Sequence, residues 1–268
     1  EAVVASGARS REASHLPPAP NRTMMEAIPQ DVAALSGYAP HVAGGPTQHQ
    51  WSPYVMNSGT VMAICGKDFA VIAGDTRMSV GYQIQSRKVG KLLKITDKTV
   101  LATGGHCQAD TIQLQKLLRA RMTQYQHQNH KEAKTSAIAQ LTSQMLYNRR
   151  FFPLLTKNII AGLDEDGVGC IYTFDVVGCL ERVRVACDGS GEELIQPVLD
   201  NILERQHQTD REGPPVLHVD YGKEEVINIV KDAFTSAGER DITTGDFVDI
   251  WVIDKEGVHQ ERFDLKFD

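Results

Sequence analysis

Apolar positions in this chain form two kinds of pattern, short continuous runs and longer stripes, which predict strands and helices. Two short runs, Thr60–Cys65 and 69–73, flank a Gly-Lys-Asp turn at 66–68, a pattern typical of a β-hairpin. Further runs that predict strands lie at 82–84, 91–95, 99–103, 158–163, 168–174, 180–186, Phe247–Asp254 and 258–265. Strands therefore occupy three separate parts of the chain.

Apolar residues spaced three and four apart predict helices between these groups of strands. The predicted helices cover about 108–126, 135–149, 194–206 and 223–237. The order is strands, two helices, strands, two helices, strands, without the alternation that a parallel sheet requires. Two antiparallel sheets packed face to face, with a helix pair outside each, would bury every stripe. The pattern thus predicts an α+β protein with a four-layer αββα sandwich.

The first 49 residues differ from the rest, because they carry six prolines and no sustained periodicity. Such a segment cannot bury enough apolar surface to offset the entropy of ordering it. We expect residues 1–49 to be a flexible N-terminal arm and 50–268 to form one domain.

Composition excludes several classes of function. The net charge of −6 and the lack of a long basic run argue against a nucleic-acid partner. No run of eighteen apolar residues predicts a membrane span. The five cysteines form no C-x-x-C pair, and their odd number suits a reducing compartment. His127 and His130 lack a third ligand, so we predict neither a metal nor a cofactor.

Candidate chemistry gathers around residues 57–77, where Gly59-Thr60 precedes the hairpin and Asp75 and Arg77 follow it. Lys91 is the next candidate charge along the chain. These residues and their order resemble the start of a proteasome β subunit. The resemblance extends from about residue 51 to the C-terminus. It implies that residues 1–49 are a prosegment cleaved near Gln50; the alternative is an uncleaved arm. It implies the fold of N-terminal nucleophile hydrolases, in which a threonine hydroxyl attacks and its own freed α-amine acts as the base.

One position departs from the active pattern of that family. There, the aspartate lies sixteen residues after the nucleophile and the lysine thirty-two after it; counting back from Asp75 and Lys91 leads both times to Gly59. Thr60 is one residue late, and in a strand that shift turns a side chain to the opposite face. We therefore expect Thr60 to point away from Asp75 and Lys91, and no residue to be catalytic.

The resemblance also assigns roles to three residues further along. Gly105 would supply an oxyanion-hole N–H, Ser190 would lie near the amine of the nucleophile, and Asp241 would be a second acid of the site. Gly105 could equally be a plain strand-to-helix turn, and Ser190 an N-terminal helix cap, which is the interpretation we favour. With Gly59, Asp75 and Lys91, these residues would form a vestigial pocket.

The run Arg-Arg-Phe-Phe-Pro at 149–153, with 158–164, resembles one non-catalytic branch of the family, at the sixth position of the β ring. The resemblance implies a structural subunit of the 20S core, a 28-subunit assembly of stacked rings. Its partners would be other α and β subunits, together with the polypeptide substrates in the chamber. The subunit would take part in ubiquitin-dependent protein degradation, in the cytoplasm and nucleus.

Two alternatives stay open at this point. The first is an active threonine endopeptidase, cut between Gly59 and Thr60, with Thr60 as its nucleophile. The second is a free-standing amidase of the same fold, which would need a serine, cysteine or threonine at position 59.

Overall fold

Two antiparallel sheets form the centre of the fold in the computed structural model, which describes residues 52–204 and 218–267. The first sheet has the order β10 (Val185–Gly189), β1 (Thr60–Cys65), β2 (Ala70–Asp75), β11 (Phe247–Asp254) and β12 (Gly257–Asp264). The second has the order β5 (Leu92–Thr96), β6 (Thr99–Gly104), β7 (Lys157–Leu163), β8 (Gly169–Phe174) and β9 (Leu180–Val183). Strands β3 (Met78–Val80) and β4 (Gln83–Ser86) make a separate hairpin.

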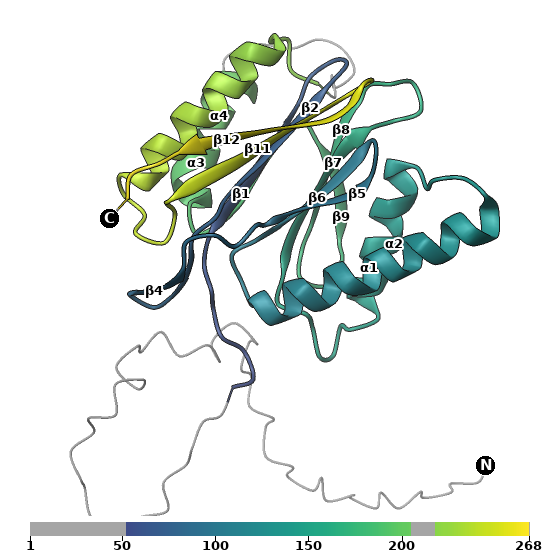
Figure 1. Cartoon of the computed structure of the whole chain (residues 1–268), viewed down its shortest axis with the longest axis horizontal. Helices are drawn as coiled ribbons and strands as arrows, with labels where there is room; N and C mark the ends of the chain where they lie inside the picture. The colour runs from purple at the N-terminus through teal and green to yellow at the C-terminus, as the bar shows by residue number, and fades with distance from the viewer. Residues whose placement is uncertain (1–51, 205–217, 268) are drawn as a thin grey trace, which may run out of the picture. The chain divides into compact units, whose positions relative to one another are not determined.

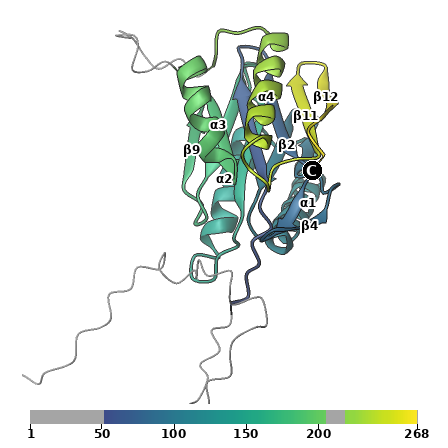
Figure 2. The same ribbon diagram turned by 90° about the vertical axis from the view of Figure 1, so that its left-hand side faces the viewer.

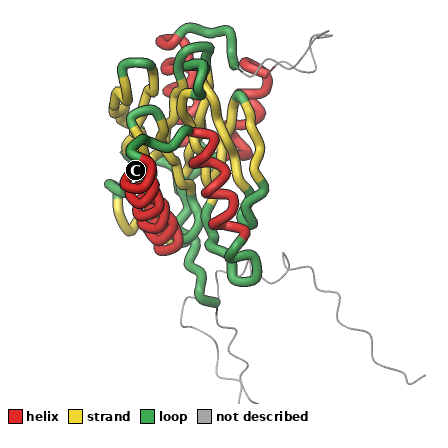
Figure 3. Tube along the Cα trace, turned by 90° about the vertical axis from the view of Figure 1, so that its right-hand side faces the viewer, coloured by secondary structure: helices red, strands yellow, loops and turns green. Residues whose placement is uncertain are grey.

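Helices cover the outer face of each sheet. The helices are α1 (Gln108–Asn129), α2 (Thr135–Tyr147), α3 (Glu192–Leu199), which continues as a π-helical turn (Asp200–Glu204), and α4 (Lys223–Gly238). Helices α3 and α4 lie on one side of the strands and α1 and α2 on the other (Figure 1). Figure 2 looks onto α3 and α4, and Figure 3 looks from the opposite side onto α1 and α2. The predicted αββα sandwich is confirmed.

Three apolar layers fill the spaces between these elements. Along β1, Met62 and Ile64 pack beneath α3 and α4, whereas Val61 and Ala63 face the second sheet. A third layer lies between the second sheet and helices α1 and α2. Because both faces of β1 are covered, the strand is an unbroken apolar run and shows no polar alternation.

The predicted single strand at 180–186 is wrong, because the chain changes sheets within it. Residues 180–183 pair with β8 in the second sheet, and residues 185–189 pair with β1 in the first. Arg184 lies at the crossing, where its carbonyl accepts a hydrogen bond from the Cys65 N–H and its guanidinium pairs with Glu204. An unbroken run of strand-forming residues does not reveal such a crossing.

The predicted N-terminal arm over 1–49 lies outside the described residues. Among the helices that are described, none combines the length and the apolar character needed to cross a lipid bilayer.

Candidate functional site

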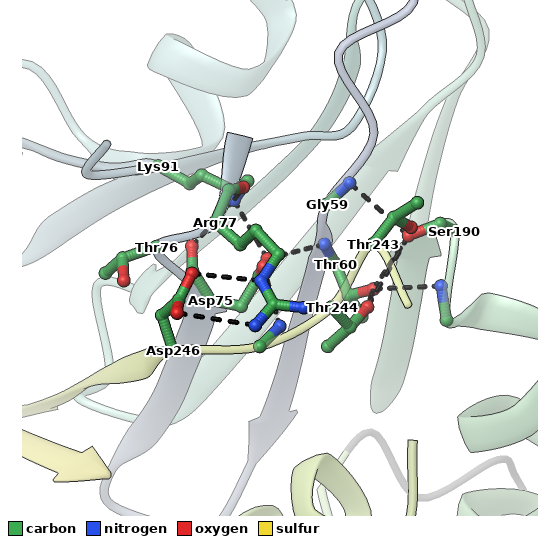
Figure 4. Close-up of polar contacts among 12 residues, drawn as sticks. Gly59, Thr60, Asp75, Thr76, Arg77, Lys91, Ser190, Thr243, Thr244 and Asp246 are labelled. Carbon is green, nitrogen blue, oxygen red and sulfur yellow. Dashed lines mark hydrogen bonds and ion pairs between the residues drawn. The ribbon is translucent and has the colours of Figure 1, made fainter. Parts of the chain in front are cut away.

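The site lies where strands of both sheets and three loops meet at one end of the sandwich. Gly59 precedes β1 and Thr60 begins it, Asp75 ends β2, and Lys91 precedes β5. Ser190 lies between β10 and α3, and the loop at 241–246 joins α4 to β11. Figure 4 shows how the side chains of this region face one another.

Asp75 and Lys91 form a buried ion pair. The Lys91 Nζ lies 2.9 Å from the Asp75 Oδ1 and also donates to the carbonyl oxygens of Asp75, at 2.8 Å, and Arg77, at 2.7 Å. The two side chains are 0% and 3% exposed. Burial raises the pKa of Asp75, while Lys91 and the Thr60 N–H, 2.7 Å from Oδ1, act in the opposite direction. The ammonium group thus has three acceptors for its three protons.

A side chain at position 59 would point into this pair. Gly59 has φ +109°, and a Cβ placed on it would lie 2.2 Å from the Lys91 Cε, 2.6 Å from its Nζ and 3.2 Å from the Asp75 Oδ1. Position 59 is therefore the one that faces the lysine and the aspartate, as the spacing predicts. In this chain the lysine itself fills the space that a side chain there would need.

The hydroxyl of Thr60 belongs to a different network, on the opposite face of β1. Its Oγ1 accepts a hydrogen bond from the Gly191 N–H at 2.8 Å and lies 2.6 Å from the Thr244 Oγ1. The Thr244 hydroxyl donates to the Asp241 Oδ2 at 2.6 Å. Thr60 is 0% exposed. The predicted change of face is confirmed, although the backbone N–H of Thr60 still reaches Asp75.

Asp241 does not join the Asp75–Lys91 pair. Its Oδ1 accepts hydrogen bonds from the backbone N–H and the hydroxyl of Thr243, at 2.9 and 2.8 Å. Although burial raises the pKa of Asp241, these hydrogen bonds and those from Thr244 and Ser190 hold it below its usual range. The three predicted charges thus divide between two networks.

The interpretation of Ser190 as a helix cap is wrong. Helix α3 has Gly191 as its N-cap, with no side-chain capping bond. The Ser190 Oγ instead accepts a hydrogen bond from the Gly59 N–H at 3.3 Å and lies 3.4 Å from the Thr60 Oγ1. This is the neighbourhood that the family resemblance implied for the serine.

Glycines surround the carbonyl group of Gly59. Gly105 has φ +51°, and a Cβ on it would lie 2.4 Å from the Gly59 oxygen. Gly189 has φ +105°, and its Cβ would lie 2.0 Å from the same oxygen. Both positions therefore require glycine for backbone conformation and for close approach. The oxyanion-hole role of the Gly105 N–H stays a prediction.

The segment upstream of Gly59 has no regular secondary structure, but hydrogen bonds of Asn57 tie it to the fold. The Asn57 N–H donates to the His106 carbonyl at 2.7 Å, and the Asn57 carbonyl accepts from the Ser79 N–H at 3.1 Å. The Asn57 Oδ1 also accepts from the Gln108 N–H, at the start of α1, at 2.9 Å. In this form the Gly59 nitrogen is an amide, which cannot act as the base that the chemistry requires.

Arg77 and Asp246 brace the loop that carries Thr244. The Arg77 Nε lies 2.9 Å from the Asp246 Oδ2, and its Nη1 donates to the Ile242 carbonyl at 2.8 Å. Burial raises the pKa of Asp246, but hydrogen bonds from Arg77 and Arg87 outweigh it and lower the pKa. The sequence placed Arg77 near the site but gave no signal for a partner so far along the chain.

Lys157, Asp188 and Glu192 form an ionic cluster at the edge of the site. The Lys157 Nζ lies 2.6 Å from the Asp188 Oδ1 and 2.7 Å from the Glu192 Oε2. Burial raises the pKa of Asp188 to about 6, in spite of the attraction of Lys157.

This cluster predicts a dependence of stability on pH. A carboxyl pKa above the unfolded value of about 3.9 means that the folded state binds the proton more tightly. The resulting stabilisation is complete below about pH 4 and is lost as the pH rises through about 6. The free energy of unfolding of Asp188→Asn, measured relative to the wild type, should therefore be about 2 kcal/mol higher at pH 7 than at pH 4. Each pKa unit corresponds to about 1.4 kcal/mol. Denaturant unfolding at both values measures it.

The matched control for this prediction is Asp166→Asn, which changes an exposed carboxylate in a turn. Unfolding curves for Asp188→Asn that keep a constant offset from the wild type over this range would contradict the assignment.

The described residues contain one group with several metal-ligating side chains close together, on the β11–β12 turn. Asp254, Glu256 and His259 place one ligand atom each within 4.8 Å of one another. However, the Asp254 carboxylate already pairs with Lys223 Nζ at 2.6 Å and accepts the Glu256 N–H at 2.9 Å. The group lies apart from the site and contributes nothing to its chemistry.

Comparison with known proteins gives consistent matches over most of the chain. A family model described as "Proteasome subunit" matches residues 55–253. "Proteasome subunit beta type-1" of Dictyostelium discoideum is 51% identical over 225 residues, which cover 83% of this chain and 93% of that protein. The proteins of the same name from Danio rerio and Arabidopsis thaliana are 43% and 45% identical, over 84% and 82% of this chain and 92% and 99% of their own lengths.

Proposed function

The chain belongs to the proteasome subunit family, as a β-type subunit of the 20S core, and from that premise we propose that it is a non-catalytic member. It assembles with other proteasome subunits and takes part in protein degradation. Its own contribution is structural: it completes the β ring and forms part of the wall of the proteolytic chamber.

The observation that carries this proposal is that residue 59 is a glycine. A nucleophilic mechanism needs a hydroxyl or thiol, beside a base and within reach of substrate. The residue that faces Lys91 and Asp75 is a glycine, and the space beside it holds the lysine side chain. The ion pair therefore has nothing to activate, and its remaining role is to stabilise the ends of strands β1 and β2.

The geometry of Thr60 argues against the rival in which that residue attacks. If the chain were cut before Thr60, its new amine would lie near Asp75, on the side of the Asp75–Lys91 pair. Its hydroxyl would still lie on the other face, fully buried and bonded to Gly191 and Thr244. The hydroxyl would then lie away from Lys91 and Asp75, inside a hydrogen-bond network that excludes a substrate. The free-standing amidase is disfavoured because position 59 carries no side chain.

The proposal extends to the surroundings of the subunit. We propose a 28-subunit assembly of α and β rings, polypeptide substrates in its chamber, and a place in ubiquitin-dependent degradation. We also propose cytoplasmic and nuclear localisation. The five cysteines support it, because none forms a disulfide and thiols persist in reducing compartments.

Replacing Thr60 with valine tests this function in the assembled core. Valine keeps the shape of threonine without its hydroxyl, so we expect cores that contain Thr60→Val to hydrolyse peptide substrates at the wild-type rate. The measurement is the hydrolysis of fluorogenic peptides with acidic, basic and apolar residues before the cut, per mole of purified core.

Thr60→Ser is the matched control, because it keeps a hydroxyl at the same position. Loss of one peptidase activity in cores with Thr60→Val, but not in those with Thr60→Ser, would establish Thr60 as a nucleophile and refute the proposal.

A further inference from the structure

The end of α2 and the turn that follows it expose three aromatic side chains in six residues. We call residues 147–152 the aromatic–arginine turn; its members are Tyr147, Asn148, Arg149, Arg150, Phe151 and Phe152. Phe151 is 94% exposed, Phe152 63% and Tyr147 58%. Single apolar residues are common on protein surfaces, but a contiguous cluster of this kind marks a site of interaction.

The backbone holds this turn in one conformation. The N–H groups of Arg149, Arg150 and Phe152 each donate to the carbonyl three residues earlier, at 2.9, 3.0 and 2.9 Å. The upstream arm supports it from the other side, where the Tyr54 hydroxyl donates to the Pro153 carbonyl at 2.9 Å. The rings of Tyr54 and Phe152 lie 6.2 Å apart. Phe151 is therefore presented outward by a preorganised loop.

The turn also carries two positive charges in an acidic protein. Arg149 and Arg150 are exposed, and neither takes part in an ion pair with any residue in the described part of the chain. The Arg150 guanidinium lies 5.8 Å from the centre of the Tyr147 ring. Both arginines are thus available for carboxylates on another molecule.

A hollow lies next to the turn and shares Tyr147 with it. Its volume is about 320 Å³, large enough for a side chain. Its walls come from the end of α2 and the turn between β8 and β9, and its lining residues are Ser143, Gln144, Tyr147, Asn148, Val177, Gly178 and Cys179. The aromatic–arginine turn and the hollow therefore lie side by side, as they would in a surface that is complementary in shape to a partner.

We propose that the aromatic–arginine turn is an anchor that docks into a neighbouring proteasome subunit. The partner would receive Phe151 in an apolar pocket bordered by carboxylates that meet Arg149 and Arg150. Exposed aromatic and arginine residues on a rigid support have the composition and preorganisation of interface hot spots. A passing substrate polypeptide is the less favoured occupant, because it must be released, whereas a permanent contact gains from a fixed anchor.

Site-specific cross-linking identifies the occupant. Cores assembled with p-benzoylphenylalanine in place of Phe151 are irradiated, and the products are located by mass spectrometry. We expect one product, on a segment of another proteasome subunit that contains aspartate or glutamate. Cross-links only to substrate polypeptides, only within this chain, or to nothing would overturn the proposal.

The incorporation of variants with substituted side chains measures how much the aromatic–arginine turn contributes to assembly. Tagged full-length chain competes with untagged wild type during assembly, and mass spectrometry gives the ratio in purified cores. Phe151→Ala should lower incorporation about 30-fold, which corresponds to a hot spot of about 2 kcal/mol. The double variant Arg149→Gln with Arg150→Gln should also lower incorporation. Its loss relative to the wild type should grow as the salt concentration falls, because the ionic contribution is then larger.

Two controls separate the possible reasons for failure. Phe151 makes little contact within the chain, so Phe151→Ala should leave the thermal unfolding of the free chain unchanged; a lowered midpoint would assign the effect to folding and contradict the proposal. If wild-type chain fails to enter cores, the proposed function itself is wrong. If it enters them and the variants equal it, only the docking proposal falls.

Discussion

Replacing Lys91 with methionine is expected to lower the free energy of unfolding by about 3–5 kcal/mol. The methionine fills nearly the same volume, so packing changes little. The carboxylate of Asp75, however, would remain fully buried with only the N–H groups of Thr60 and Gly245 as donors. Removing one partner of a buried ion pair leaves an uncompensated charge, which is the origin of the large cost. Chemical denaturation measures it.

A second substitution should rescue much of this loss. In the double variant Lys91→Met with Asp75→Asn the buried charge is gone, so we expect recovery of more than half of the stability. Lys134→Met is the control, since Lys134 and its partner Glu165 are both mostly exposed and such pairs contribute about 0–1 kcal/mol. Equal effects of the changes at Lys91 and Lys134 would contradict the account of the pair.

Replacing Gly189 with alanine is expected to destabilise the protein by about 4 kcal/mol. Part of this cost, about 1–3 kcal/mol, comes from placing a β-carbon on a residue with φ +105°. The rest comes from collision with the Gly59 carbonyl oxygen, 2.0 Å from the added carbon, and overpacking of this kind costs a further 1–3 kcal/mol or so. The Gly59 oxygen belongs to the backbone, so it cannot move aside as the end of a flexible side chain could.

Two other glycines allow these contributions to be separated. Gly257 has φ +131° with no atom within 4 Å of an added β-carbon, so Gly257→Ala reports the backbone strain alone. Gly90 has neither a positive φ nor a close neighbour, so Gly90→Ala should change stability by less than about 0.5 kcal/mol. The predicted order of destabilisation is Gly189, Gly257, Gly90. If Gly189→Ala were no more destabilising than Gly257→Ala, crowding at the Gly59 carbonyl would not be a constraint.

The layers of the fold could be predicted from the sequence because each depends on a local period. The stripe of α4 and the runs of β1 and β11 carry their own signal of burial. The change of sheets at Arg184 could not be predicted in this way. It depends on which neighbours pair with each half of the run, and that is settled by contacts with β1 and β8, not by residues 180–186 themselves.

Some parts of the site could likewise be predicted from the sequence, and others could not. The spacing implied by the family resemblance predicted that position 59, and not Thr60, faces Asp75 and Lys91, because in a strand a shift of one residue changes the face. Ser190 was misassigned because a serine before two glutamates has the local pattern of a helix cap. The Arg77–Asp246 pair and the reach of Asn57 to α1 escaped prediction because both join residues far apart in the chain.

The most direct test of a silent subunit is its reaction with an electrophilic peptide. Native cores are treated with a peptide epoxyketone or vinyl sulfone, and each subunit is examined by intact mass and N-terminal sequencing. The account predicts that this chain carries no adduct and that its N-terminus lies upstream of Gly59, while other β subunits in the same sample are labelled. A chain that begins at Thr60 and carries the adduct on that residue would contradict it.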